Sequence, residues 1–198
     1  MNSERVYNLF RESVEAKMEV GEQLAAPLSL AADYITETLV SGNKVLVAGN
    51  GASSALAQIF CSAMLDRFEQ ERPSLPAIWL GSHINTAVSM GSDQGLHDMY
   101  AKPVRALGQT GDILLVLSCN GKASNLVQAI SAAHDRNMRV IALTGRNGGD
   151  ISSLIAAEDL ELRASMHKRS RVHEIHLLCL YCLLDLIDSK LFGLGDDI

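Results

Sequence analysis

Five short apolar runs, separated by segments of helical character, constrain the fold of this chain most strongly. The runs are Lys44–Ala48, Ala77–Leu80, Ile113–Leu117, Val140–Thr144 and Leu160–Arg163. Most are continuously apolar rather than alternating, which is typical of strands that are buried on both faces. Because strand-like and helical segments alternate, the pattern predicts a five-stranded, parallel, doubly wound α/β sandwich of the Rossmann or flavodoxin type.

Helical segments occupy the intervals between the five runs. They are expected at Ala52–Phe68, Asn85–Met90, Leu96–Leu107, Ala123–Asn137 and Ile151–Ala156. No linker, repeat or low-complexity segment is visible, so residues 1–198 are interpreted as one domain. Within it we distinguish N-terminal helices (1–42), an α/β core (43–165), a C-terminal helix (166–192) and an acidic tail (193–198).

Two N-terminal helices are expected before the first strand. Val6, Phe10, Val14 and Met18 recur every four residues and form one apolar stripe. A second helix is expected to begin near Pro27, a residue suited to the first helical turn, and to end at Ser41-Gly42. A sandwich of this size does not need these helices for its own core, which favours a role in subunit packing.

The last long helix, from about Lys168 to Phe192, supports the same interpretation. Between Ile175 and Ile187 its apolar residues surround more than one face. Because a single sheet covers only one side of such a helix, the sequence predicts that a second copy of the chain covers the rest. The terminal helices are therefore expected to build a homo-oligomer.

Composition excludes several classes of protein. Apolar residues make up 47% of the chain, charged residues 20%, and the net charge is −6, which argues against a general nucleic-acid or anionic-membrane binder. The first residues are charged where a signal peptide would be apolar, and the most apolar stretch, 175–184, is too short to span a bilayer. A cytoplasmic protein is expected.

Four cysteines, Cys61, Cys119, Cys179 and Cys182, fit a reducing compartment without disulfides. The Cys179-x-x-Cys182 spacing also occurs in zinc and redox sites. Here it lies within an apolar helical run and has no second pair elsewhere, so buried core cysteines are the better interpretation.

Small polar loops follow the first and third strand-like runs. Ligands of open α/β sheets bind at the carboxyl ends of the strands, where glycine turns and helix N-termini offer free N–H groups to anions. Either loop alone could be a purely structural turn, and the pair favours a ligand site. The residues expected to bind the ligand are Asn50, Gly51, Ser53, Ser54, Ser118, Asn120 and Lys122.

Several longer motifs make the chain similar to a known family. They are GNGASS, RFEQERPSLPAI, VRALGQTGDILLVLS, VIALTGRNGGD and RVHEIHLL…CLLDLID. Together they resemble the sugar isomerase (SIS) domain family, specifically its phosphoheptose isomerase group, over nearly the whole chain. RFEQERPSLPAI and DLIDSKLF are most similar to the branch whose members associate with the replication initiator DnaA. The resemblance implies a five-stranded SIS sandwich and a homotetramer built through the terminal helices.

The resemblance also identifies the positions where an isomerase carries its chemistry. Phosphoheptose isomerases convert sedoheptulose 7-phosphate through an enediol, and many use zinc. The family pattern has His and Glu on the helix after the first loop, and Gln and His on the last helix. Those positions hold Ile59, Ala63, His173 and Tyr181, which are expected to converge at the mouth of the loops. The resemblance therefore implies no catalytic group, no metal and no cofactor.

The second loop also departs from the family pattern. The family has S-T-S-G-N-S where this chain has Ser118-Cys119-Asn120-Gly121-Lys122-Ala123. Asn120 could still donate a hydrogen bond and Lys122 could attract a phosphate group, so weak phosphosugar binding remains an alternative. The basic run 166–171 is either solvated surface or a contact for a phosphate or acidic partner.

Leu191 and Phe192 end the last helix beside the acidic tail. They could fold back onto their own domain, or they could serve as an apolar anchor for another protein. In the resembling branch this Leu-Phe matches the initiator-binding surface. The favoured hypothesis is a non-catalytic homotetramer that binds DnaA at the replication origin; the alternatives are a phosphoheptose isomerase with a rearranged site and a phosphosugar-binding regulator.

Overall fold

All five expected strands form one parallel sheet in the computed structural model, which describes residues 2–82, 84–93 and 95–193. The strands are β1 (Val45–Gly49), β2 (Ala77–Trp79), β3 (Ile113–Ser118), β4 (Arg139–Gly145) and β5 (Leu160–Ala164). Their order is β2-β1-β3-β4-β5, and every pairing is parallel. The predicted α/β fold class is therefore confirmed, whereas residues 194–198 of the expected acidic tail lie outside the described residues.

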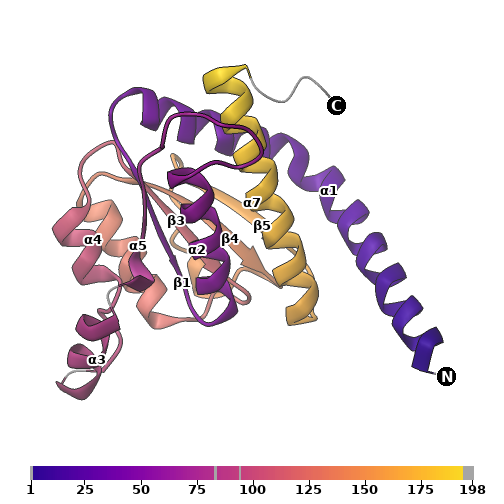
Figure 1. Ribbon diagram of the computed structural model, residues 1–198. Helices are drawn as coiled ribbons and strands as arrows, with labels where there is room; N and C mark the ends of the chain where they lie inside the picture. The colour runs from indigo at the N-terminus through magenta and orange to yellow at the C-terminus, as the bar shows by residue number, and fades with distance from the viewer. Residues whose placement is uncertain (1, 83, 94, 194–198) are drawn as a thin grey trace.

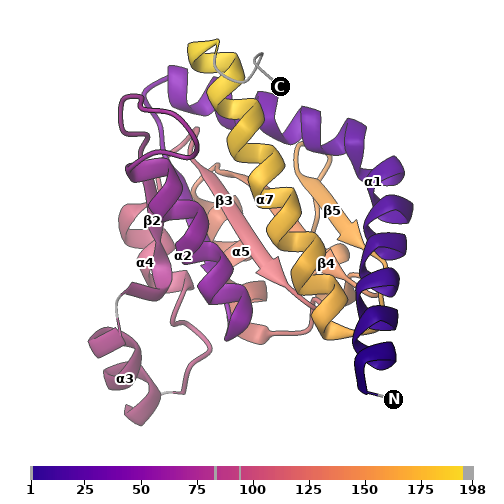
Figure 2. The ribbon, with the colours of Figure 1, turned by 45° about the vertical axis from the view of Figure 1, so that its right-hand side comes forward.

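Helices cover both faces of the sheet (Figures 1 and 2). One layer consists of α1 (Asn2–Val40), α2 (Ala52–Leu65) and α7 (Arg169–Phe192), and the other of α4 (Ala101–Leu107), α5 (Ser124–Asp135) and α6 (Gly149–Ser152). Successive side chains of a strand point to opposite faces of the sheet, so each strand contributes to both cores. Val47 packs in the first core and Leu46 in the second. The short α3 (Ile84–Asp93) and the 3₁₀ turn η1 (Leu80–Ser82) follow β2.

The expectation of two N-terminal helices is wrong, because α1 is one continuous helix with Pro27 inside it. An interior proline removes one backbone hydrogen bond and costs ~3 kcal/mol or more. Leu24 and Leu28, on either side of Pro27, are both buried in the same core. We attribute the continuity of the helix to this shared burial, which offsets the cost of the proline.

The N-terminal half of α1 extends away from the sheet (Figure 1). The stripe predicted there exists, but it is not covered by this chain: Phe10 is 71% exposed and Met18 67% exposed. On α7, Leu178 and Tyr181 are exposed as well, while Leu180 and Leu184 are fully buried. A second face of α7 thus remains open, as its sequence predicted.

Arg72 holds the connection between α2 and β2 in place. Its Nε donates to Asp188 Oδ1 of α7 at 2.8 Å, and its two Nη atoms donate to the carbonyl oxygens of Ala63 and Met64 at 2.7 and 2.8 Å. The carbonyl groups at the C-terminal end of a helix lack intrahelical partners. Arg72 therefore caps α2 and ties it to α7 with one buried side chain.

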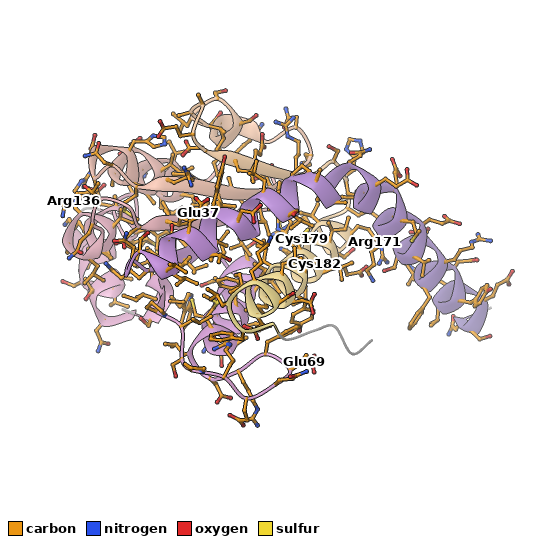
Figure 3. The ribbon with its side chains drawn as sticks, turned by 90° about the horizontal axis from the view of Figure 1, so that it is seen from above. Glu37, Glu69, Arg136, Arg171, Cys179 and Cys182 are labelled. Atoms are coloured by element: carbon orange, nitrogen blue, oxygen red, sulfur yellow. The ribbon has the colours of Figure 1, made fainter. Side chains whose placement is uncertain are left out.

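The two cysteines of the Cys-x-x-Cys segment lie on α7 beside α1 (Figure 3). Cys179 is buried, and burial raises the pKa of its thiol to about 12. Cys182 is half-buried, and burial also raises the pKa of its thiol. The interpretation as core cysteines is confirmed. Across the described ranges, no helix combines the length and apolar character needed to cross a membrane.

Candidate functional site

The two small polar loops lie at the point where the sheet changes its winding direction. β1 and β3 are neighbours in the sheet, and the chain leaves β1 toward β2 and β3 toward β4. Ligands of open α/β sheets bind in the crevice at this position. A pocket of about 340 Å³ lies there, lined by Asn50, Ser53, Leu117, Ser118, Cys119, Asn120, Ala123, Leu126, Arg146 and Arg169.

Hydrogen bonds between the loops hold this pocket in shape. The side-chain amides of Asn50 and Asn125 exchange two hydrogen bonds, at 2.9 and 3.0 Å, between the first loop and α5. Ser118 Oγ accepts a hydrogen bond from the backbone N–H of Gly121 at 3.0 Å. Gly121 has φ 65°, and a Cβ there would lie 1.7 Å from the carbonyl oxygen of Gly148. Only glycine allows these two loops to pack so closely.

Four of the seven residues expected to bind a ligand line the pocket, namely Asn50, Ser53, Ser118 and Asn120. The other three do not. Gly51, with φ 55°, forms the turn that starts α2, and Ser54 Oγ accepts a hydrogen bond from Trp79 Nε1 at 3.1 Å. The side chain of Lys122 is exposed to solvent.

Sequence reasoning missed Arg146 and Arg169, both of which line the pocket. Arg169 belongs to the basic run 166–171, whose members separate in the structure. Lys168 forms an ion pair with Glu12 of α1 at 2.6 Å, and Arg171 pairs with Glu174, so these two cations are bound elsewhere. The position of Arg169 could have been found from the sequence, because it is the first residue of α7 and lies at the carboxyl ends of the strands.

The electrostatic character of the pocket suits an anion. Two guanidinium groups line it, and α2, α5 and α7 all begin at or beside its lining residues. Helix N-termini carry a partial positive charge and unpaired N–H groups. Arg146 has φ 58°, a left-handed conformation that is uncommon for residues other than glycine. The pocket can thus hold a phosphate or carboxylate group.

None of the four positions that match the isomerase pattern is among the residues that line this pocket. Ile59 on α2 is 40% exposed, and Tyr181 on α7 is 38% exposed and stacks on Phe68 with ring centroids 5.7 Å apart. Ala63 is half-buried on α2. Among the four, His173 comes nearest, since its Nε2 lies 2.7 Å from Sγ of the lining residue Cys119. This contact places His173 beside the pocket, and the convergence of all four positions stays a prediction.

His173 and His176 do not act as a pair. His176 is fully buried, donates a hydrogen bond from Nε2 to the carbonyl oxygen of Thr144 at 2.9 Å, and has an unpaired Nδ1. Burial lowers its pKa to about 4, so the ring is neutral at physiological pH. His173 faces Cys119, and both burial and the charge of Arg169 lower its pKa.

The residues at these positions do not fit the zinc ion that many isomerases of this type use. Isoleucine and alanine offer no ligand atom, and zinc sites are built from Cys, His, Asp and Glu. Within residues 2–82, 84–93 and 95–193, no group of three or more such side chains is arranged to hold a metal ion. We therefore derive no chemical step through zinc.

A larger hollow, of about 720 Å³, lies at the opposite end of the strands. Two of the acidic residues that line it, Asp112 and Asp159, hold the fold together. Asp112 pairs with Lys44 at 2.6 Å, and Asp159 accepts from the N–H of Val140 at 2.7 Å and contacts His134 at 2.8 Å. These carboxylates close the loops before β1, β3 and β5, so the candidate site remains the pocket at the carboxyl ends.

The fold and the pocket together define a doubly wound α/β protein with a polar crevice at its switch point. Residues 9–145 match the model of the SIS domain family. Because this match spans more than half of the 198 residues, the chain belongs to the SIS domain family.

Relatives with two different names are similar to this chain over nearly its whole length. A phosphoheptose isomerase of Chromohalobacter salexigens is 46% identical over 189 residues, which are 96% of this chain and 96% of the relative. The DnaA initiator-associating protein DiaA of Yersinia pseudotuberculosis is 45% identical over 195 residues, which are 98% of this chain and 99% of the relative.

A solved structure has the same architecture. The phosphoheptose isomerase from Francisella tularensis superposes with a TM-score of 0.92 at 39% identity, covering 96% of this chain and 100% of the other. The resemblance found in the sequence motifs is confirmed. The two names leave catalysis and initiator binding as separate possibilities, which the site residues must distinguish.

Proposed function

We propose that this chain is a non-catalytic SIS-fold homotetramer that binds a DnaA-type replication initiator in the cytoplasm and promotes its assembly at the replication origin. The observation that carries the proposal is the set of side chains at the isomerase positions. Ile59 and Ala63 can neither move a proton nor bind a metal ion. General acid–base catalysis typically supplies ~10²–10⁴-fold, so the loss of these groups removes useful turnover.

Relatives named DiaA, at about the same identity as those named isomerase, support an initiator as the partner. The proposed contact lies at the end of α7, where Leu191 and Phe192 are half-buried and pack partly against the core. Each therefore keeps part of its side chain accessible. An aromatic residue in such a position can carry much of the energy of an interface.

The exposed stripe of α1 supports the tetramer. Val6, Phe10, Val14 and Met18 are each more than half exposed and occupy one face of the helix. The exposed Leu178 and Tyr181 of α7 and Ile59 of α2 provide a further apolar surface. Burying these residues against other copies of the chain would remove them from water. A tetramer would also present each initiator contact repeatedly, and such avidity raises effective affinity by ~10²–10⁴-fold.

An isomerase assay tests the absence of catalysis. The protein is incubated with sedoheptulose 7-phosphate, with and without added zinc, and formation of the aldose heptose 7-phosphate is measured. We expect no turnover in either condition. Robust turnover, or stoichiometric binding of zinc, would contradict the proposal and favour a phosphoheptose isomerase with a rearranged site.

The initiator contact is tested with Phe192→Ala and with Leu107→Ala as the matched control, because Leu107 is a partly exposed apolar residue at the end of α4, in the other layer. Phe192→Ala should weaken binding to DnaA by roughly 2 kcal/mol or more. Since Phe192 is only half-buried, its loss should reduce stability by less than the ~3–5 kcal/mol typical of a fully buried phenylalanine. Unchanged DnaA binding by Phe192→Ala would exclude this contact.

The tetramer is tested by sedimentation of Phe10→Asp beside Arg11→Asp. Both residues lie on the N-terminal half of α1, but Phe10 belongs to the apolar stripe, whereas Arg11 forms an exposed ion pair with Glu15 at 3.8 Å. We expect Phe10→Asp to dissociate the assembly and Arg11→Asp to keep it. A wild-type protein that sediments as a stable monomer at micromolar concentration would refute the tetramer.

A second candidate function, a phosphosugar-binding regulator, is favoured by the pocket itself. Arg146, Arg169, Ser118 and Asn120 offer charged and neutral donors to a phosphate group. This function is compatible with initiator binding, because the pocket is lined by neither Leu191 nor Phe192. Calorimetric titration with sedoheptulose 7-phosphate, in the absence of DnaA, tests this function. Measurable binding would support it, and no heat of binding would contradict it.

A further inference from the structure

A cysteine and a histidine meet at the wall of the pocket. Cys119 Sγ lies 2.7 Å from His173 Nε2 and 3.9 Å from Ser53 Oγ. The contact joins the loop after β3 to the first turns of α7, across 54 residues of sequence. Cys119 lines the pocket and is half-buried, as is His173. A small molecule in the pocket would therefore lie against Cys119.

Cys119 differs from the other three cysteines of the chain. Burial raises the pKa of Cys61 and of Cys179 to about 12, and it also raises the pKa of Cys182. Those thiols are packed in the core of α2 and α7 and act as small apolar groups. Cys119 alone among them has an imidazole as its hydrogen-bond partner and an opening to a polar pocket.

His173 is suited to act as the base for this thiol. Burial and the charge of Arg169 lower its pKa, so the ring is neutral at physiological pH and its Nε2 lone pair can accept the S–H proton. A nucleophile within hydrogen-bond distance of a base is the usual arrangement of an activated cysteine. The thiolate left after proton transfer would lie at the wall of a pocket that Arg146 and Arg169 also line.

We propose that Cys119 and His173 form a reactive thiol site that captures the carbonyl group of a small phosphorylated aldehyde as a reversible thiohemiacetal. Arg146, Arg169 and Asn120 would hold the phosphate group. A volume of about 340 Å³ suits a small ligand of this kind. The inference goes beyond initiator binding and does not depend on it.

The reaction is balanced without an oxidant or a further reactant. His173 Nε2 takes the proton of the Cys119 thiol, and the sulfur attacks the carbonyl carbon to form an S–C bond. The electron pair of the C=O π bond moves to the oxygen atom, which then takes the proton from the imidazolium. Reversal of the same steps releases the aldehyde and restores the thiol.

The rate of alkylation by iodoacetamide, followed by peptide mass spectrometry, measures the reactivity of each cysteine. Cys182, which is also half-buried, serves as the internal control. We expect Cys119 to react about tenfold faster than Cys182 or more, and His173→Gln to remove most of that advantage. Equal rates for Cys119 in the wild type and in His173→Gln would refute the role of the base.

Glyceraldehyde 3-phosphate and glycerol 3-phosphate are the paired probes for capture, because they carry the same phosphate group and only the first has a carbonyl. With glyceraldehyde 3-phosphate labelled by ¹³C at the carbonyl carbon, we expect an NMR signal from a thiohemiacetal carbon. It should be absent in Cys119→Ser, whose thermal unfolding should match the wild type.

The two probes also separate capture from simple anion binding. Protection of Cys119 from iodoacetamide by both probes without a new carbon signal would mean anion binding only, and protection by neither would mean no site. Either result would overturn the proposal. DnaA binding by Cys119→Ser should be unchanged, so failure here is distinguishable from failure of the proposed function.

Discussion

The lining of the pocket and the helix positions that match the isomerase pattern are built from different kinds of group. We call the first the loop wall; it consists of Asn50, Ser118, Asn120, Arg146 and Arg169 at the ends of the strands. The second, which we call the helical wall, does not line the pocket and consists of Ile59 and Ala63 on α2 and Tyr181 on α7. The loop wall keeps donors for an anion, whereas the helical wall offers no acid, base or metal ligand.

The difference separates features that the backbone fold requires from features that depend on single side chains. The loop wall depends on turns and close backbone contacts, such as that of Gly121 with Gly148. These contacts hold the loops after β3 and β4 together. The helical wall depends on single side chains at or near the surface, where Ile59 is 40% and Tyr181 38% exposed, so that replacing them affects the core less. A chain can therefore keep the anion-binding part of this site while it lacks the catalytic part.

The largest expected effect concerns the support of the helical wall. Arg72 is 1% exposed and Asp188 8% exposed in their ion pair, and Arg72 also caps α2. Arg72→Ala leaves a buried carboxylate without its partner, which typically costs ~3–5 kcal/mol. We expect this loss of stability in urea-induced unfolding, accompanied by loosening of α2 against α7.

Arg67→Ala is the matched control for that measurement. Arg67 pairs with Glu71 at 2.6 Å, but the two side chains are 49% and 81% exposed. Exposed pairs contribute ~0–1 kcal/mol. Equal losses for Arg72→Ala and Arg67→Ala would show that the buried pair does not support the helical wall.

The next effect is the dependence of stability on pH through His176. This residue joins α7 to the end of β4 by its hydrogen bond to the carbonyl oxygen of Thr144. Its pKa is lowered from 6.5 to about 4 by burial. The unfolded chain therefore binds a proton between pH 6.5 and 4 that the folded chain does not. The stabilising contribution is complete above pH 6.5 and is lost as the pH falls toward 4, by roughly 3 kcal/mol.

Unfolding curves of the wild type and of His176→Gln between pH 7 and 4 test this prediction, because glutamine keeps a donor for the carbonyl of Thr144 but does not titrate. The slope in this window should be much smaller for the variant. Below pH 4.5 both proteins should lose stability through Glu161. Burial opposes ionisation of this carboxyl, but hydrogen bonds from Arg163, Thr144 and Ser152 hold its pKa below the ordinary value. Identical slopes between pH 6.5 and 4 would exclude His176 as the cause.

The sequence predicts the sheet and the position of the pocket well, because both depend on local patterns. Continuous apolar runs define the strands to within a residue or two at each end, and the glycine loops after β1 and β3 mark the switch point. Pro27 misled the prediction of α1, since tertiary burial of Leu24 and Leu28 outweighs a local helix-breaking signal.

The lining of the pocket is less accessible to sequence reasoning. Lys122 lies in the second loop, but its side chain points to solvent, whereas Arg146 and Arg169 come from segments far along the chain. Contacts between distant segments leave no periodic pattern. The contact of Cys119 with His173 belongs to the same class, because 54 residues separate its two partners.

Those observations give a smaller expected effect on the loop wall. Arg169→Ala should weaken binding of sedoheptulose 7-phosphate by about 1.5 kcal/mol, the lower end for a hydrogen bond to a charged group. Lys122→Ala should leave it unchanged, because Lys122 does not line the pocket. Calorimetric titration of the two variants measures the difference. The opposite ranking would place the phosphate beside Lys122, as the sequence alone suggested.

The last prediction is that a double variant of the helical wall does not restore isomerase activity. The double variant Ile59→His and Ala63→Glu restores the two family residues on α2. It should still show no turnover of sedoheptulose 7-phosphate with added zinc. Tyr181 remains stacked on Phe68 at the position of the second histidine, and His173 remains bound to Cys119. Zinc sites need three or four protein ligands, and the two residues restored on α2 supply at most two of them.

The quadruple variant, which adds His173→Gln and Tyr181→His, is the informative contrast. It restores the family pattern on both helices, and we expect it to bind zinc where the double variant does not. Equilibrium dialysis with zinc measures this without relying on activity. Turnover by the double variant would show that a catalytic group exists outside the four positions, and the helical wall could then no longer be described as inert.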